Sequence, residues 1–129
     1  MILKSIAVLF ATICVATISE AQKHEMKHIP ATDSHIVYMG RTSSTNSDEV
    51  RFTFPGVSMM ANFTGQSIAL EVKPGSGFFM VELDEQHPFK IKSGEKDSVI
   101  ILSESLSEGA HNMKIMYAQE GYEQKPAFR

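Results

Sequence analysis

The sequence predicts an all-β protein with a single antiparallel β-sandwich of about eight strands. From His35 onward, apolar and polar residues alternate with a period of two, which is the spacing of half-buried strands. Gly, Pro, Asn and Asp interrupt this alternation at the short intervals typical of sandwiches. No stretch carries a helical apolar pattern over the length of a helix, so no helical layer is expected.

The first two expected strands flank a polar segment. "HIVYMG" (35–40) leads into "RTSSTNSDEV" (41–50), where Ser, Thr and Asn side chains favour bonds to their own backbone. A loop is therefore expected at this segment. "VRFTF" (50–54) is the next strand, and Pro55 and Gly56 end it.

The next strands are expected at residues 57–63 and 67–72, where the alternation is clearest. Their predicted core face comprises Val57, Met59, Ala61, Phe63, Ile68, Leu70 and Val72. Burial of every second side chain indicates an antiparallel sheet with one covered face.

Four further strands are expected in the second half of the chain, at residues 78–84, 89–92, 98–102 and 111–118. Their predicted core face includes Phe79, Val81, Leu83, Met113, Ile115 and Tyr117. "DEQHP" looks like a hairpin connection. "SVIIL" (98–102) is apolar throughout, so we expect this strand to be covered on both faces.

The N-terminal segment has the parts of a secretory signal peptide. Lys4 supplies a positive start, residues 6–18 are an apolar stretch, and Ser-Glu-Ala provides a cleavage site after Ala21. The apolar stretch is too short to span a bilayer, and no later stretch is apolar enough to do so. Residues 1–21 are therefore expected to be a signal peptide, and the protein is expected to be exported, either periplasmic or extracellular.

Two parts of the mature chain are expected, an N-terminal tail at residues 22–34 and one domain at residues 35–129. Cys14 is the only cysteine and lies within the signal peptide, so the exported domain is expected to contain no disulfide.

The segment "HEMKH" (24–28) matches His-Glu-x-x-His, which presents two zinc ligands and a general base on one helical face in metalloproteases. After cleavage, His24 would be the third residue of the mature chain, and Pro30 would end any helix after about one turn. A solvated tail is therefore expected. A free amine at Gln22 with His24 would suit copper(II) or nickel(II), but N-terminal Gln tends to cyclise and block that amine. No metal or cofactor is predicted.

No catalytic residue is predicted. Nucleophilic catalysis by Ser needs a base and a strained turn such as Gly-x-Ser-x-Gly or Gly-Asp-Ser, and the sequence contains neither motif. "GSG" (75–77) is expected to be a hairpin turn after Pro74. "DSH" (33–35) has the residue types of a triad, but sequence neighbours point apart on an extended chain.

Four titratable residues, one carboxylate pair and two single histidines, are candidates for a site. Glu82 and Asp84 share one face of an expected strand, where they could form a carboxylate pair or part of a calcium site. Calcium takes six or more oxygens, so a solvated face is expected instead. His87 and His111 lie beside turns and are expected to be exposed or structurally bonded.

The formal net charge is −3, and no run of Lys or Arg forms a basic stripe, so nucleic acid is not an expected partner. Sugar-binding modules present flat aromatic faces, above all Trp, and this chain has no Trp. Most aromatic residues at strand spacing belong to a core. The aromatic residues that remain candidates for carbohydrate contact are Tyr38, Phe78, Tyr117 and Tyr122.

Several segments together resemble the N-terminal domain of carbohydrate esterase family 2. The segments are "YMGRT", "VRFTFPGVSMMANFTGQSIALEV", "FFMVELDEQ", "SLSEGAHNMKIMYAQEG" and "PAFR", which span about His35 to Arg129. The most specific is "RFTFPGVSMMANFTG". Phe54 stands where the family is expected to have Trp, which weakens the case for an aromatic sugar platform there. The resemblance implies a jelly-roll, galactose-binding-like sandwich.

Members of this family are exported enzymes that remove acetyl groups from plant polysaccharides such as xylan and mannan. Their catalytic Ser and His lie in a following α/β domain of the SGNH-hydrolase type, so none is carried onto this sequence. The resemblance implies either a truncated gene product or a separate module. "PAFR" is expected to begin a closing strand at a sheet edge, where unpaired backbone groups would lead to self-association.

The sequence therefore predicts an accessory, non-catalytic domain of an exported acetyl-polysaccharide esterase. Its expected partners are an SGNH-type catalytic domain and an acetylated plant polysaccharide. A free-standing carbohydrate-binding module is the alternative. An esterase acting alone is a third hypothesis, disfavoured by the lack of a nucleophile motif.

Overall fold

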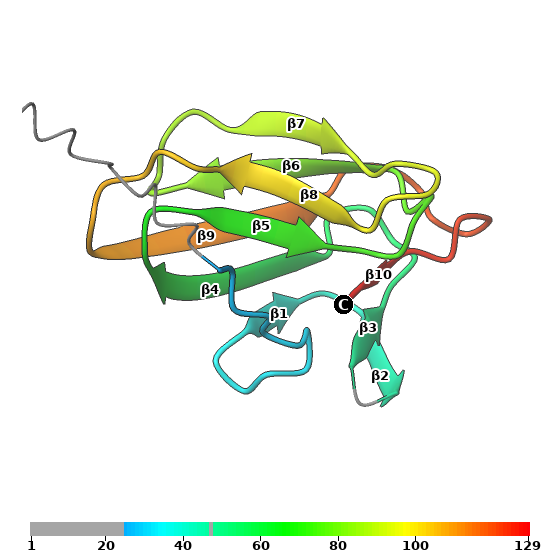
Figure 1. Cartoon of the computed structure of the whole chain (residues 1–129). Coiled ribbons are helices and arrows are strands. Elements are labelled where there is room, and N and C mark those ends of the chain that lie inside the picture. The colour runs from blue at the N-terminus through cyan, green and yellow to red at the C-terminus, as the bar shows by residue number, and fades with distance from the viewer. Residues whose placement is uncertain (1–24, 47) are drawn as a thin grey trace, which may run out of the picture.

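The computed structural model describes residues 25–46 and 48–129, and within them the chain forms ten strands and no helix (Figure 1). The strands are β1 (Val37–Met39), β2 (Ser43–Asn46), β3 (Glu49–Arg51), β4 (Ser58–Thr64), β5 (Ile68–Glu71), β6 (Phe78–Leu83), β7 (Phe89–Lys92), β8 (Val99–Ser103), β9 (Ala110–Tyr117) and β10 (Ala127–Phe128). No helix in this described part is long and apolar enough to cross a membrane. The predicted signal peptide lies outside the described residues.

The first layer is a five-stranded antiparallel sheet in the order β1-β4-β9-β6-β7. Its register aligns core side chains across strands that are distant in sequence. Met59 of β4 faces Tyr38 on one side and Ile115 on the other, and Ile115 in turn faces Val81. Directly opposed residues point to the same face, so these four side chains form one row toward the interior.

The second layer consists of two smaller sheets, β10-β3-β2 and β5-β8, that join at one point. Val72, just after β5, forms an antiparallel bridge with Phe128 of β10. The amide of Lys73 donates to the carbonyl of Ala127 at 2.9 Å, and the amide of Arg129 donates to Glu71 at 3.0 Å. The continuous order is therefore β8-β5-β10-β3-β2, and the predicted antiparallel sandwich is confirmed.

The expectations for the segments that form β10 and β2 are wrong. "PAFR" does not lie at an edge, because β10 hydrogen-bonds to β3 on one side and to the segment 71–73 on the other. The polar segment 41–50 is not only a loop, since β2 pairs antiparallel with β3 within it. In both cases the strand is defined by pairing with a partner, which its own short sequence does not reveal.

An aromatic cluster joins the two layers. Phe52 and Phe128 come from the second layer, and Phe79 and Tyr117 come from the first. Phe52 lies 4.8 Å from Tyr117 and 4.7 Å from Phe128, measured between ring centroids. Phe79 contacts both Tyr117 and Phe128 at 5.2 and 5.6 Å. Burial of these rings stabilises the packing of the two layers, and the described residues include no cysteine that could add a disulfide.

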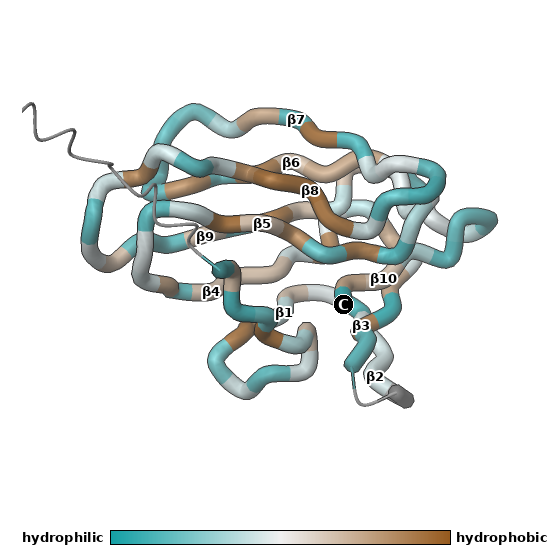
Figure 2. The backbone as a smooth tube through the Cα atoms, in the orientation of Figure 1, coloured by the Kyte–Doolittle hydropathy of each residue, from teal (hydrophilic) through white to brown (hydrophobic). Residues whose placement is uncertain are grey.

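Strand β8 differs from its prediction. Ile100 and Leu102 point toward the core, but Val99 and Ile101 are 53% and 57% exposed. They face Glu71 and Ala69 of β5, on the surface of the second layer. Figure 2 shows the hydrophobic run of β8 on this layer. The expectation of cover on both faces is therefore wrong, because the side chains of Val99 and Ile101 are exposed on this face of the β5-β8 sheet.

The outer face of the five-stranded sheet carries an apolar strip made of Val37, Met39, Met60, Met80 and Met116. The register brings Met39, Met116 and Met80 into one row across the sheet and places Val37 opposite Met60. Met39 is 58% exposed. Since large apolar patches are uncommon on monomeric proteins, this strip indicates a surface for packing.

The N-terminal segment is exposed from residue 25 to residue 29, as expected of a tail. Ala31 is an exception, since it is buried against the core. The hydroxyl of Tyr38 donates a 2.7 Å hydrogen bond to the Ala31 carbonyl. This bond attaches the segment to the sandwich just before β1.

Candidate functional site

The four aromatic residues predicted for carbohydrate contact lie in different surroundings. Tyr117 is fully buried and its hydroxyl donates to the Ser76 carbonyl at 2.6 Å, so its ring offers no surface to a sugar. Tyr38 lies on the core face of β1 and packs against Phe128 at 5.9 Å. These two side chains stabilise the sandwich.

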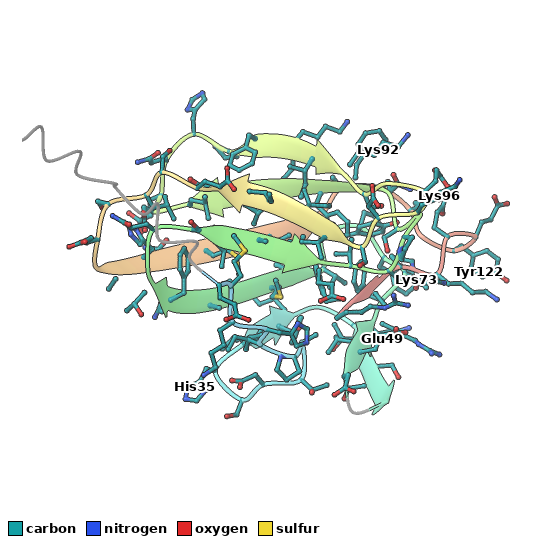
Figure 3. The ribbon with its side chains drawn as sticks, in the orientation of Figure 1. His35, Glu49, Lys73, Lys92, Lys96 and Tyr122 are labelled. Carbon is teal, nitrogen blue, oxygen red and sulfur yellow. The ribbon has the colours of Figure 1, made fainter. Side chains whose placement is uncertain are left out.

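The other two candidates reach the surface. Tyr122 is 84% exposed on the turn before β10, at the end of the sandwich where Figure 3 also shows Glu49 and Lys73. Phe78 is half-buried, and the ammonium group of Lys90 lies 4.2 Å from its ring centroid. Carbohydrate contact stays a prediction for Tyr122 and Phe78.

Asp84 does not share a face with Glu82, because the strand β6 ends at Leu83 and Asp84 adopts a positive φ of 52°. Its carboxylate instead accepts the backbone N–H of Asn112 at 2.9 Å and contacts Nδ1 of His111 at 2.5 Å. Glu82 and Asp84 therefore do not form the carboxylate pair that was the alternative to a solvated face. His111 is a buried, structurally bonded histidine.

The described residues contain no group of three or more His, Cys, Asp or Glu side chains that could hold a metal ion. Glu25 and His28 of the His-Glu-x-x-His segment are both exposed and in no helix. His24 and Gln22 lie outside the described residues, so the copper or nickel alternative is not addressed by the structure.

A basic cleft of about 600 Å³ opens beside the β2-β3 hairpin. Its charged lining residues are Arg41, Glu49, Arg51, Lys73, Lys125 and Arg129. Three separate parts of the chain supply them: the β2-β3 hairpin with its lead-in, the end of β5, and the C-terminal segment around β10. The pairing of β10 with β3 and with residue 72 brings these parts together.

Glu49 is the only acidic side chain among the described residues that line the basic cleft. One of its oxygens accepts from Nε of Arg51 at 2.8 Å, and the other accepts from Nε of Arg129 at 3.1 Å. The bond from Arg51, followed by the bond from Arg129, lowers the pKa of Glu49 below its ordinary value. This carboxylate therefore stays ionised and holds two guanidinium groups at the wall of the cleft.

Lys73 lines the same cleft as Glu49 and follows the end of β5 by two residues. Its ammonium group donates to the backbone carbonyl of Lys125 at 3.2 Å, and the carbonyl of Gln124 is 3.5 Å away. Both partners are neutral carbonyl groups. The positive charge of Lys73 is thus positioned in the cleft without being neutralised by a carboxylate.

A second hollow of about 390 Å³ adjoins the basic cleft, and Arg41 lines both. Phe54 forms one wall of this hollow and is 53% exposed. The guanidinium carbon of Arg41 lies 5.5 Å from the ring centroid of Phe54, within the range of a cation–π contact. The site therefore combines a cationic cleft with an accessible aromatic ring.

The sequence did not reveal the basic cleft, because its cations are dispersed and form no run. Only the antiparallel pairing of β10 with β3 brings Arg129 to Glu49. Comparison with the expected Trp argues against Phe54 in the sequence, yet its ring is 53% exposed just before the Pro55-Gly56 turn. The i, i+2 spacing of Glu49 and Arg51 on one strand face is the local signal from which their ion pair could be predicted.

Comparison with known proteins agrees with the resemblance found in the sequence. The family model "Carbohydrate esterase 2 N-terminal" matches residues 38–129. An acetylxylan esterase / glucomannan deacetylase from Cellvibrio japonicus (strain Ueda107) is 27% identical over 96 residues, which is 73% of this chain and 27% of that protein. The chain thus spans little more than a quarter of the length of this relative.

Solved structures give the same result for the fold. A family two carbohydrate esterase from Cellvibrio japonicus superposes with a TM-score of 0.68 at 26% identity, covering 78% of this chain and 30% of that one. A family two carbohydrate esterase from Clostridium thermocellum, in complex with cellohexaose, gives a TM-score of 0.60 at 23% identity, covering 72% of this chain and 29% of that one. With most of the sandwich covered by the family model, the protein belongs to the carbohydrate esterase 2 N-terminal family.

Proposed function

We propose that this chain acts as the accessory, non-catalytic β-sandwich domain of an exported carbohydrate esterase that removes acetyl groups from plant polysaccharides. The observation that carries the proposal is the family match over residues 38–129, together with a relative described as an acetylxylan esterase / glucomannan deacetylase. The domain supports and positions an SGNH-type catalytic domain, and it helps to shape a polysaccharide cleft.

The apolar strip supports this role because it suits packing against another domain. Met39 and Met116 are exposed at its surface, and methionine side chains adapt to an opposing surface more readily than branched ones do. The matched segment is 27% and 30% of the length of two such relatives, so most of each relative lies outside it and is available to cover such a strip.

A chimera tests the proposal. Residues 38–129 would replace the matched segment of the Cellvibrio japonicus esterase, and release of acetate from acetylated xylan would be measured. The chimera is expected to deacetylate, whereas the isolated chain is expected to give no turnover of an aryl acetate above the buffer rate. Turnover by the isolated chain would contradict a non-catalytic role.

Substitutions within the chimera locate the contact between the domains. Met39→Glu combined with Met116→Glu places two charges on the apolar strip and is expected to weaken deacetylation and lower the melting temperature. Val99→Glu combined with Ile101→Glu is the matched control, since these side chains are 53% and 57% exposed on β8 of the other layer, outside the strip. Equal effects of both changes would exclude the strip as the packing surface.

Export is part of the proposal and has its own test. Mass spectrometry of the mature protein is expected to find Gln22 as the first residue, in its open or cyclised form. A mature protein that retains residues 1–21 would contradict cleavage after Ala21.

A free-standing carbohydrate-binding module is the second candidate function. It is favoured by the exposed rings of Tyr122 and Phe54 near one end of the sandwich. In this case the isolated chain would bind xylan or mannan, and Tyr122→Ala would remove the binding. An isolated chain that binds neither polymer would leave the accessory role as the better supported function.

A further inference from the structure

The basic cleft concentrates positive charge on a chain that is negative overall. Five of its twelve Lys and Arg residues line this one cleft, against one carboxylate, while the formal net charge of the chain is −3. A cleft lined by one sign of charge attracts ligands of the opposite sign and raises their local concentration. The ligand that fits the cleft therefore carries negative charge.

The cations are arranged with free donors. Arg51 and Arg129 both reach Glu49 through Nε, and no other hydrogen bond of their guanidinium groups occurs among the described residues. A guanidinium group has five N–H donors in a planar fork that matches a carboxylate. Each arginine can thus hold Glu49 and still donate to a ligand.

The size and remaining lining of the cleft suit a sugar unit. Its volume of about 600 Å³ lies within the range of small-molecule sites, about 300–1,000 Å³. Thr42, Ser43 and Thr53 add hydroxyl groups to the lining. Phe54, in the adjoining hollow, adds an exposed ring on which a pyranose can stack. An acidic protein segment would need none of these hydroxyl groups or this ring.

We propose that the basic cleft binds the carboxylate of a uronic acid unit in an acidic polysaccharide. Arg51, Arg129 and Lys73 would contact the carboxylate, and Arg41 with Phe54 would contact the neighbouring sugar. This inference rests on the proposed function in one respect, that the ligand is a polysaccharide. It adds the class of polysaccharide, one that bears carboxylates.

Calorimetric titration of the mature full chain tests the inference with a matched pair of ligands. The probes are oligogalacturonate and the same oligosaccharide after chemical reduction of its carboxyl groups. The acidic ligand is expected to bind about tenfold or more tightly than the reduced one at low salt. Binding should weaken as salt is raised, because surface charges are screened.

Variants assign the binding to the cleft. Arg41→Gln and Lys125→Gln each remove one cation without removing a salt bridge of the structure, and each is expected to weaken binding severalfold. Lys96→Gln removes the same charge from an exposed turn outside the cleft and is the control. Glu49→Gln removes the competing carboxylate and is expected to tighten binding in a variant that melts as the parent does. Should Glu49→Gln fail to fold, the first two variants decide.

Three results of these titrations would overturn the inference. Equal binding of acidic and reduced ligands would exclude carboxylate recognition, and an equal loss in Lys96→Gln would show a diffuse charge effect. Absence of binding to both ligands would direct the search to an acidic protein partner. The deacetylation assay of the chimera is independent of these titrations, so the inference can fail while the proposed function stands, and the reverse is also possible.

Discussion

His111 and Asp84 form a close pair, with 2.5 Å between Nδ1 of the imidazole and Oδ2 of the carboxylate. The other ring nitrogen lies 2.6 Å from the backbone carbonyl of Ser107. A carbonyl oxygen can only accept, so Nε2 carries a proton, and a second proton on Nδ1 completes the bond to Asp84. The carbonyl of Ser107, followed by the Asp84 carboxylate, therefore raises the pKa of His111 above its ordinary value of 6.5.

The stability of the fold should depend on pH through this pair. The raised pKa of His111 means that its contribution is complete below pH 6.5 and is lost as the pH rises through the folded-state value. The backbone N–H of Asn112, followed by His111, lowers the pKa of Asp84, so its contribution is complete above the ordinary value of 3.8 and is lost in acid. Melting temperatures are expected to be highest between these two ordinary values.

His111→Gln is expected to remove most of the loss of stability on the alkaline side. Thermal melts of the parent and variant across neutral and mildly alkaline pH provide the measurement. His87→Gln is the control, because His87 is exposed on the turn before β7. A parent protein whose melting temperature does not fall above neutral pH would contradict a protonated His111.

Tyr117→Phe is expected to destabilise the domain by about 1–3 kcal/mol, since it leaves the buried carbonyl of Ser76 without its donor. Chemical denaturation gives the free energy of unfolding directly. Tyr122→Phe makes the same chemical change at an 84% exposed ring and should cost less than about 0.5 kcal/mol. Similar losses in both variants would argue against a structural role for the Tyr117 hydroxyl.

Phe128→Ala is expected to cost about 3–5 kcal/mol, because it removes a buried ring that contacts Phe52 and Phe79. Phe54→Ala, at an exposed ring, should leave the free energy of unfolding nearly unchanged. The comparison is made by denaturant titration, with unchanged slopes as a check on two-state behaviour. A small effect of Phe128→Ala would show that β10 is not part of the core in solution.

Gly77→Ala is expected to cost about 1–3 kcal/mol. Gly77 has a φ of 109°, which an L-residue rarely adopts, and an added methyl group would overlap the side-chain amide of Gln119. That amide accepts the N–H of Phe78 at 3.0 Å, so it cannot move away without losing the bond. Gly94→Ala is the control, because the nearest atom to its added methyl lies at 3.6 Å. Equal melting temperatures for the two variants would contradict this account.

The sequence predicts those parts of the fold that depend on local alternation. Strands β4, β6 and β9 occur at the expected residues, with Met59, Phe79 and Ile115 buried as expected. An alternating pattern identifies both the strand and its covered face, because successive side chains point to opposite sides. β8 has no such alternation, and its unbroken apolar run does not indicate which face is covered.

The features that the sequence misses depend on pairing between distant segments. β2 has no apolar alternation and β10 is very short, so each is recognisable only beside β3. The basic cleft follows from the same pairing, which places Arg129 against Glu49. The four aromatic candidates illustrate a further difficulty, because residue type alone does not show whether a ring lies inside, as that of Tyr117 does, or outside, as that of Tyr122 does.

The central position of β10 has a consequence for the order of events during biosynthesis. A nascent chain emerges from the ribosome N-terminus first, and domains generally fold as units. Until residues 127–128 have emerged, no strand lies between β3 and β5, and the rings of Phe52 and Phe79 lack a partner from the end of the chain. The second layer of this domain therefore cannot close before its C-terminal strand has emerged.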